Sequence, residues 1–267
     1  MNTGQLTSWI RRFGLMHLLD QLRYRYQYLR NYSVNRTFKK THPETALPPD
    51  YLMYESFQLH YAKYYQGGKD VAMWIREQLE DFSPLNGIAI LDWGCGPGRV
   101  VRHLPEVIGP QCRYYGTDYN VRSIEWCKQH LHGVEFYINQ LQPPLPFDRA
   151  FFGAIYGISI FTHLSEQNHI QWLEELARVS APGGLLLLTT HGEVFKAIMT
   201  PEEKLQFDAG QLVVRSKARE GHRVFTAFQP PRFFSAIVAS AFEVLRHTPG
   251  KIQSWGMEQD VWILRKK

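Results

Sequence analysis

The residues in this sequence best suited to chemistry are two aspartates beside a glycine-rich turn. The turn contains Gly94, Gly96 and Gly98, and Asp92 stands two residues ahead of it. Glycine lets the backbone approach a ligand closely, and a helix that begins after the turn directs its N–H groups at that ligand. Asp118 ends the next predicted strand, where a carboxylate can accept both hydroxyls of a ribose. The pattern therefore predicts a site for a ligand that carries a ribose.

Two common ligands offer such a ribose, NAD and S-adenosylmethionine. The dinucleotide fingerprint is G-x-G-x-x-G, in which the last glycine allows close helix–strand packing. The spacing here is shorter, Gly94-x-Gly96-x-Gly98. A shorter turn suits S-adenosylmethionine, because its amino-acid tail carries no pyrophosphate. The spacing favours S-adenosylmethionine.

Two stretches carry a resemblance to a known family. Asp92-Trp-Gly-Cys-Gly-Pro-Gly98, followed by Gly116-Thr-Asp118, resembles the first two motifs of class I S-adenosylmethionine-dependent methyltransferases. Phe161-Thr-His-Leu-Ser-Glu166, with Leu176–Gly184, is similar to a bacterial subgroup that acts on small molecules or saccharides. The resemblance implies in-line transfer of a methyl group from S-adenosylmethionine to an O or N nucleophile, with S-adenosylhomocysteine as product.

The resemblance also implies which residues hold the cofactor. In the family, the loop after the third strand flanks the adenine with a polar side chain and an apolar neighbour, and this loop falls on Asn139, Gln140 and Leu141. No metal ion is expected. The full set implied for cofactor binding is Asp92, Trp93, Gly94, Cys95, Gly96, Gly98, Asp118, Tyr119, Asn139, Gln140, Leu141, Tyr156 and Gly157.

A general base is needed only if the acceptor carries its proton in a poorly reactive state. His163 follows the fourth predicted strand and His191 follows the fifth, so both can face an acceptor. The alternative for His163 is that it shapes the cofactor pocket, and for His191 that it belongs to a turn at Gly192. His60, in the helical cover before the first strand, is a weaker third candidate. His163 and His191 are therefore the two candidate catalytic residues.

The elements that position these residues form an α/β, Rossmann-like sheet of seven strands. The resemblance implies the strand order 3-2-1-4-5-7-6, with the last strand antiparallel, an N-terminal helical cover and an inserted β-hairpin at about 209–229. The expected strands are Ile88–Leu91, Arg113–Tyr119, Val134–Ile138, Ala150–Ser159, Leu185–His191, Phe242–Leu245 and Gln259–Leu264. The expected helices are 7–31, Tyr51–Phe82 with a break at Gly67-Gly68, one from Arg99, one capped by Ser165 or Thr162 and ended by Ala181–Gly184, and one at about Pro231–Ser240.

Charge divides the chain into a basic arm, 1–48, and a methyltransferase domain, 49–267. Residues 1–40 hold eight Lys and Arg against Asp20, a balance of +7 that leaves −2 for the rest. The predicted helix 7–31 is amphipathic, and either docking on its own domain or self-association is favoured over binding to a membrane surface or to nucleic acid. Its apolar stripe consists of Trp9, Phe13, Met16, Leu19, Leu22, Tyr26 and Leu29.

The remaining composition narrows the class of protein. The three cysteines form no C-x-x-C pair, and the longest apolar run, Phe151 to Phe161, falls far short of the ~20 residues that span a bilayer. With no apolar signal-peptide core at the N-terminus, a cytoplasmic protein is expected. Base methyltransferases typically carry Asp/Asn-Pro-Pro-aromatic after the fourth strand, where Tyr156-Gly-Ile-Ser159 stands here. Nucleic acid is therefore not favoured as a partner, and two alternatives stay open: a nucleic-acid methyltransferase, and a cofactor-binding protein without turnover.

Overall fold

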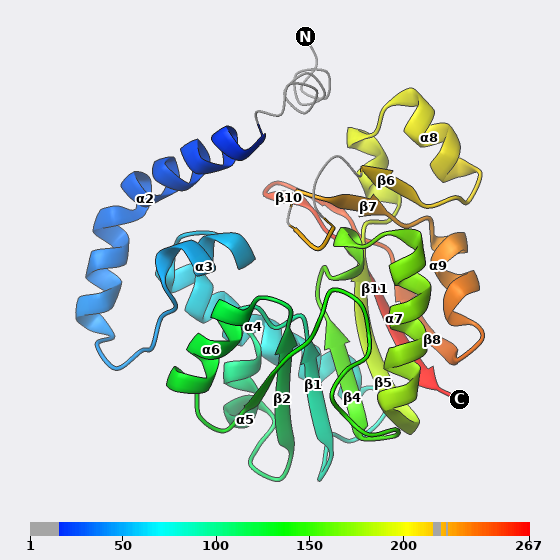
Figure 1. Ribbon diagram of the computed structural model, residues 1–267, viewed down its shortest axis with the longest axis horizontal. Coiled ribbons are helices and arrows are strands. Elements are labelled where there is room, and N and C mark those ends of the chain that lie inside the picture. Colours follow the sequence, from blue (N-terminus) through cyan, green and yellow to red (C-terminus); the bar gives the residue numbers. More distant parts are fainter. Residues whose placement is uncertain (1–15, 216–219, 223) are drawn as a thin grey trace.

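The computed structural model describes residues 16–215, 220–222 and 224–267 (Figure 1). Its helices are α2 (Met16–Thr41), α3 (Asp50–Ser56), α4 (Tyr61–Glu80), α5 (Leu104–Val107), α6 (Val121–His130), α7 (Glu166–Val179), α8 (Pro201–Asp208) and α9 (Pro231–Val238), with short 3₁₀ helices at Val101–His103, Phe161–His163 and Glu193–Ile198. Its strands are β1 (Ala89–Trp93), β2 (Arg113–Asp118), β3 (Glu135–Ile138), β4 (Phe152–Gly157), β5 (Ser180–Thr190), β6 (Val213–Arg215), β7 (Thr226–Phe228), β8 (Phe242–Thr248), β9 (Ile252–Gln253), β10 (Gly256–Met257) and β11 (Asp260–Lys266).

Seven strands form one sheet in the order β3-β2-β1-β4-β5-β11-β8. Strands β1 to β5 are parallel to their neighbours within this group, and β11 runs antiparallel to both β5 and β8. This is the expected Rossmann-like order with an antiparallel last strand, so the predicted fold class is confirmed. The order reverses at β1 and β4, and ligands of open α/β sheets bind at such a point, outside the carboxyl ends of the strands.

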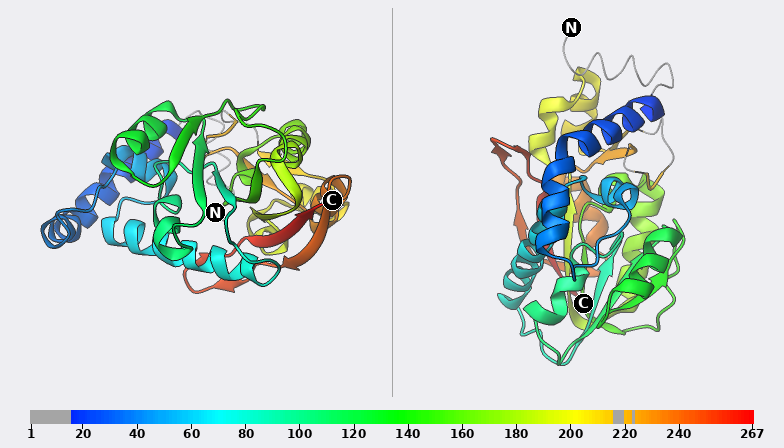
Figure 2. Two further views of the ribbon diagram at one scale, coloured as in Figure 1. Left: turned by 90° about the horizontal axis from the view of Figure 1, so that it is seen from below. Right: turned by 90° about the vertical axis from the view of Figure 1, so that its left-hand side faces the viewer.

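Alternate residues of the central strands face two separate hydrophobic cores. On one face, Ile90 of β1 belongs to the core that includes α4, α5 and α6. On the other face, Ala89 and Leu91 belong to the core that includes α7 and α9. Helices therefore cover both faces of the sheet (Figures 1 and 2). Because both faces are covered, β1 reads in the sequence as a continuous apolar run.

The break predicted at Gly67-Gly68 is wrong, since α4 runs through both glycines. A Cβ on Gly68 would lie 2.1 Å from the carbonyl oxygen of Arg99, in the backbone that follows the glycine turn. Gly68 is thus a contact point between a helix and a backbone, and packing there accounts for a glycine inside a helix. The chain breaks earlier, between α3 and α4, where His60 caps α4 by accepting from the Lys63 N–H.

The N-terminal helix also differs from its prediction. Within the described residues α2 spans Met16–Thr41, ten residues beyond the expected end, while the part of the prediction at 7–15 lies outside them. The side that docks on the domain is mixed, since Phe38 and Tyr24 pack into a hydrophobic cluster beside two asparagines. Asn31 Nδ2 donates to the Leu59 carbonyl at 2.8 Å, and Asn35 Oδ1 accepts from the Tyr61 N–H at 2.9 Å. The predicted apolar stripe is on another side, and its described members Leu19, Leu22, Tyr26 and Leu29 are exposed.

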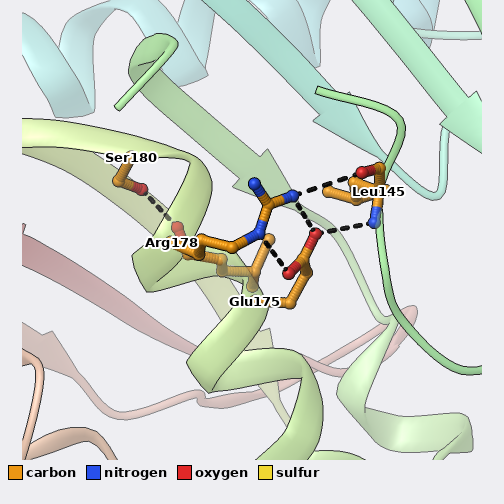
Figure 3. Close-up of polar contacts among 5 residues, drawn as sticks. Leu145, Glu175, Arg178 and Ser180 are labelled. Carbon is orange, nitrogen blue, oxygen red and sulfur yellow. Dashed lines mark hydrogen bonds and ion pairs between the residues drawn. The ribbon is translucent and has the colours of Figure 1, made fainter. Parts of the chain in front are cut away.

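An ion pair on α7 fixes the loop between β3 and β4 (Figure 3). Glu175 accepts from the Leu145 N–H at 2.6 Å and from Arg178 at 2.6 and 2.8 Å. Arg178 in turn donates to the Leu145 carbonyl at 3.2 Å. Glu175 is buried, so its carboxylate satisfies a backbone donor that water cannot reach. The same loop begins at Asn139, one of the residues expected beside the adenine.

Other boundaries shift because of tertiary pairing. The residues after Gly98 form only the 3₁₀ turn Val101–His103 and α5, and Ala181–Gly184 are part of β5. The predicted hairpin is present as the antiparallel pair β6–β7, shorter than expected, while residues 216–219 and 223 lie outside the described residues. A second antiparallel pair, β9–β10, was not predicted. Among the described residues, no helix is long and apolar enough to cross a membrane.

Candidate cofactor and acceptor site

The glycine turn leaves β1 in a conformation that favours glycine. Gly94, Gly96 and Gly98 have φ angles of 81°, 52° and 72°, in the left-handed region. Both the Gly94 and Cys95 N–H groups donate to the Thr117 carbonyl of β2, at 2.8 and 2.9 Å. These bonds hold the turn against the next strand and bring it beside the end of β2.

The carboxylate of Asp118 is fixed by two backbone donors. Its Oδ2 accepts from the Gly96 N–H at 2.8 Å and its Oδ1 from the Asn120 N–H at 2.7 Å. Burial raises the pKa of Asp118, and the two N–H bonds act in the opposite direction. Asp118 lines both cavities described below. A carboxylate that is already oriented, with lone pairs left over, is well placed to accept a pair of ribose hydroxyls.

A second acidic group lies beside the turn. Asp92 and Tyr156 are neighbours in register on β1 and β4, and both line the larger cavity. Burial raises the pKa of Asp92 to about 7, and the Tyr156 hydroxyl and the Arg99 guanidinium act against that shift. The Tyr156 hydroxyl is buried and has no hydrogen-bond partner among the described residues. The Asp92 carboxylate thus faces the cavity beside the Tyr156 hydroxyl, where a positively charged group of a ligand can pair with it.

A small apolar cavity of about 60 Å³ lies beside Asp118. Trp93, Leu141, Ile160 and Trp172 contribute to its lining, as do Asn139 and Gln140. Asn139 donates through Nδ2 to the Gln140 carbonyl at 2.6 Å, while its buried Oδ1 has no partner in the described chain. An unpartnered acceptor in an apolar slot fits an adenine with an exocyclic amino group. The described residues therefore fit S-adenosylmethionine: Asp118 and Asn139 would hold its adenosine, and Asp92 with the glycine turn would hold its amino-acid part.

The larger cavity, of about 380 Å³, extends beyond the cofactor residues. Its further lining includes Ser56 of α3, Phe57, Arg99 and Ser159. The Arg99 guanidinium lies 4.6 Å from the centre of the Phe57 ring. Ser159 has a φ of 65°, and its N–H donates to Thr189 Oγ1 at 2.8 Å. Such strained residues cluster at functional sites, and this part of the cavity is where an acceptor would enter.

The two candidate histidines occupy different positions. His163 lines both cavities, whereas His191 lines neither. His163 Nδ1 is 2.7 Å from the Phe225 carbonyl. A carbonyl only accepts, so Nδ1 carries the proton of the neutral ring and Nε2 carries the lone pair. Burial lowers the pKa of His191 to about 3, and its Nδ1 is 3.1 Å from the Ala227 carbonyl.

Residues 220–222, between β6 and β7, lie against the cavities, and Gly221 and His222 line the larger one. Glu220 accepts from the Ser165 N–H at 2.5 Å and from Asn168 at 2.7 Å. The Gly221 N–H donates to the His163 carbonyl at 3.0 Å, and Tyr119 donates to the Gly221 carbonyl at 3.0 Å. The segment therefore joins the ends of β2 and β4 across the site.

Most of the residues implied for cofactor binding come together in space. Asp92, Trp93, Gly94, Cys95, Gly96, Asp118, Tyr119, Asn139, Gln140, Leu141 and Tyr156 line one or both cavities. Gly98 and Gly157 line neither. A Cβ on Gly98 would lie 2.5 Å from Leu131, and one on Gly157 would lie 2.7 Å from Trp93, so both serve packing. Phe57 and Arg99 were not predicted as site residues; Phe57 comes from the helical cover, and Arg99 directly follows the glycine turn.

Comparison with known proteins supports this interpretation. Residues 90–184 match the family described as "Methyltransferase domain". The tRNA (carboxymethyluridine(34)-5-O)-methyltransferase of Arabidopsis thaliana is 33% identical over 39% of this chain and 24% of its own length. The demethylmenaquinone methyltransferase of Lactococcus lactis is 28% identical over 42% of this chain and 45% of its own length. The chain thus spans about a quarter of the first relative and under half of the second.

Solved structures share the fold. A SAM-dependent methyltransferase from Methanosarcina mazei superposes with a TM-score of 0.54 at 18% identity, over 71% of this chain and 96% of that one. An S-adenosylmethionine-dependent methyltransferase from Mesorhizobium loti gives 0.52 at 13% identity, over 73% and 98%. Residues 90–184 thus match a methyltransferase domain, and the sheet has the strand order of the S-adenosylmethionine-dependent methyltransferase fold, which implies S-adenosylmethionine as the cofactor.

Proposed function

We propose that this protein transfers a methyl group from S-adenosylmethionine to an O or N nucleophile of a small molecule or saccharide. The observation that carries the proposal is the continuity of the cofactor cavity with the space around Phe57, Ser159 and His163. Bound S-adenosylmethionine supplies an activated methyl group on a positively charged sulfur. The protein's main task is then to hold the acceptor in line with it, and positioning of this kind can contribute about 7–11 kcal/mol.

The named residues divide this work. Asp118 binds the ribose, Asn139 the adenine edge, and Asp92 the ammonium group of the amino-acid tail. Gly94 and Gly96 give the turn its left-handed backbone, and a Cβ at either position would meet Ile160 or Ser56 of the cavity wall. Residues 220–222 and Phe57 cover the site and limit the access of water.

His163 is the proposed general base for an acceptor hydroxyl. Its Nε2 lone pair would take the hydroxyl proton as the acceptor oxygen bonds to the methyl carbon, and the carbon–sulfur bond would break to release S-adenosylhomocysteine. The bond from Nδ1 to the Phe225 carbonyl fixes the ring in the tautomer that this step needs. His191 takes no part in this proposal, because it lies outside both cavities and its lowered pKa follows from burial.

Methylation of tRNA is the second candidate. It is favoured by relatives that are named tRNA methyltransferases, including the one from Arabidopsis thaliana, and by the cationic side chains of α2. Those relatives are matched over 39–43% of this chain, so their likeness bears on the cofactor core more than on the acceptor.

Methyl-group labelling distinguishes the two candidates. The protein is incubated with radiolabelled S-adenosylmethionine and either deproteinised small molecules or purified tRNA from the same extract. Label in the small-molecule fraction, absent with Asp118→Ala, supports the first candidate, and label in ribonuclease-sensitive material supports the second. With an acceptor in hand, His163→Asn should lower kcat about 10²–10⁴-fold with a smaller change in KM, whereas His191→Asn should not.

A further inference from the structure

Two elements near the site expose apolar side chains that the methyl-transfer site does not use. On α2, Leu18, Leu22, Tyr26 and Leu29 are each more than half exposed. On the hairpin β9–β10, Ile252 is 68% exposed and Trp255, between the two strands, is 73% exposed. Burying such side chains away from water is favourable, so a surface that presents several of them needs a partner.

The apolar side of α2 points away from the domain. At 100° per residue, Leu18, Leu22 and Leu29 fall on the side of the helix opposite Asn31 and Asn35. Those two asparagines bond to the backbone at Leu59 and Tyr61, and Tyr24 and Phe38 pack on the same side, so this mixed side faces the domain. The docking of α2 on its own domain therefore leaves the side with Leu18, Leu22 and Leu29 outward.

Cations surround this outward side. Arg23, Arg25 and Arg30 flank the leucines, and the helix continues with Arg36, Lys39 and Lys40, all exposed. Within the described residues, none of the six forms an ion pair with a carboxylate. The one acid on the helix, Asp20, accepts from the Tyr54 hydroxyl at 2.8 Å. The face thus combines aliphatic side chains with unneutralised positive charge.

Both elements rise at the same end of the molecule. In Figure 1 the first turns of α2 and the hairpin β9–β10 lie at the top, beyond the carboxyl ends of β1 and β4, and the second view of Figure 2 agrees. The cofactor cavity opens at those strand ends. The two elements therefore lie at the end of the molecule from which an acceptor would enter.

We propose that α2 and the hairpin β9–β10 bind the surface of an anionic membrane. Interfacial helices bury an apolar side among the lipids, while flanking Arg and Lys meet anionic headgroups, and tryptophan favours the same depth. A second copy fits less well, since pairing two α2 faces would bring their positive charges together. Nucleic acid fits less well, since Leu18, Leu22 and Leu29 offer neither stacking nor contacts to phosphate.

Vesicle co-sedimentation tests the proposal with the full chain. Vesicles of phosphatidylcholine with phosphatidylglycerol should bind at least about tenfold more tightly than phosphatidylcholine alone, and salt should weaken this binding. The variants Leu18→Ser/Leu22→Ser/Leu29→Ser, Trp255→Ser and Arg23→Gln/Arg25→Gln/Arg30→Gln should each lose at least tenfold. Val244→Ser, at an exposed position on the edge strand β8, is the matched control and should bind as the unmodified protein does.

Binding of S-adenosylhomocysteine by each variant shows that the fold is kept, and it separates this test from that of the proposed activity. The proposal is overturned if the protein does not bind anionic vesicles, or if the variants bind as tightly as the control. It is also overturned if light scattering shows a dimer that the leucine variant dissociates, or if tRNA binds and displaces the protein from vesicles.

Discussion

The raised pKa of Asp92 predicts how cofactor binding depends on pH. A carboxyl with a pKa of about 7 is mostly protonated at pH 6 and mostly ionised at pH 8. Only the ionised form can pair with the ligand's ammonium group, which stays charged in this range. The apparent affinity for S-adenosylhomocysteine should therefore fall about tenfold from pH 8 to pH 6, and Asp92→Asn should remove this dependence.

The same group affects the stability of the ligand-free protein in the opposite direction. Its folded pKa is raised from 3.8 to about 7, so the folded state holds a proton that the unfolded state has released. Stability is then greatest at low pH within this window and falls by roughly 1 kcal/mol per pH unit as the pH rises from 5 towards 7.

Two titrations on matched proteins measure both effects. Calorimetry with S-adenosylhomocysteine at pH 6, 7 and 8 gives the affinities, and denaturant unfolding at pH 5 to 8 gives the stabilities. The contribution of Asp92 is the difference between the unmodified protein and Asp92→Asn, because other titrating groups are common to both. An equal pH slope in the two proteins would refute the assignment of the proton to Asp92.

Three further variants test the site's supports. Gly94→Ala should lower stability by about 1–3 kcal/mol and weaken cofactor binding, because its φ is 81° and its Cβ would meet Ile160; a melting temperature and affinity like those of the unmodified protein would refute the conformational argument. Glu175→Ala leaves the buried Leu145 N–H without its acceptor, so it should lower the free energy of unfolding, measured with denaturant, by about 1–3 kcal/mol. An unchanged free energy of unfolding would show that Glu175 does not hold this loop. Tyr64→Phe removes a 3.0 Å bond to the carbonyl of Pro97 in the glycine turn and should cost about 1 kcal/mol by the same assay, and an unchanged stability would contradict it.

Local sequence patterns predicted the centre of the fold well. The run from Ile88 reads as a buried strand because both faces of β1 are covered, and the glycine spacing and Asp118 depend on neighbours close in the chain. The contacts that explain these residues are made within about thirty positions of the sequence, so a local pattern could predict them. The resemblance to the methyltransferase family supplied the strand order, which no local pattern contains.

Long-range contacts decided what the sequence could not. A glycine is needed at position 68 inside α4 because the backbone of Arg99 packs against it. The position of Gly221 over the site depends on its hydrogen bonds with Tyr119 and His163. His191 looked equivalent to His163 as a residue after a central strand. The two histidines differ because β7 packs at the end of β5, where the Ala227 carbonyl contacts His191 and buries it away from the cavities.

Calorimetric titration of the protein with S-adenosylhomocysteine, with NADH and Asp118→Ala as controls, tests the central claim most directly. We expect micromolar binding of S-adenosylhomocysteine, no binding of NADH, and loss of binding in Asp118→Ala, since that carboxylate is oriented by Gly96 and Asn120 toward the ribose. Binding of NADH, or affinity for S-adenosylhomocysteine that survives in Asp118→Ala, would contradict the assignment of this cavity to S-adenosylmethionine.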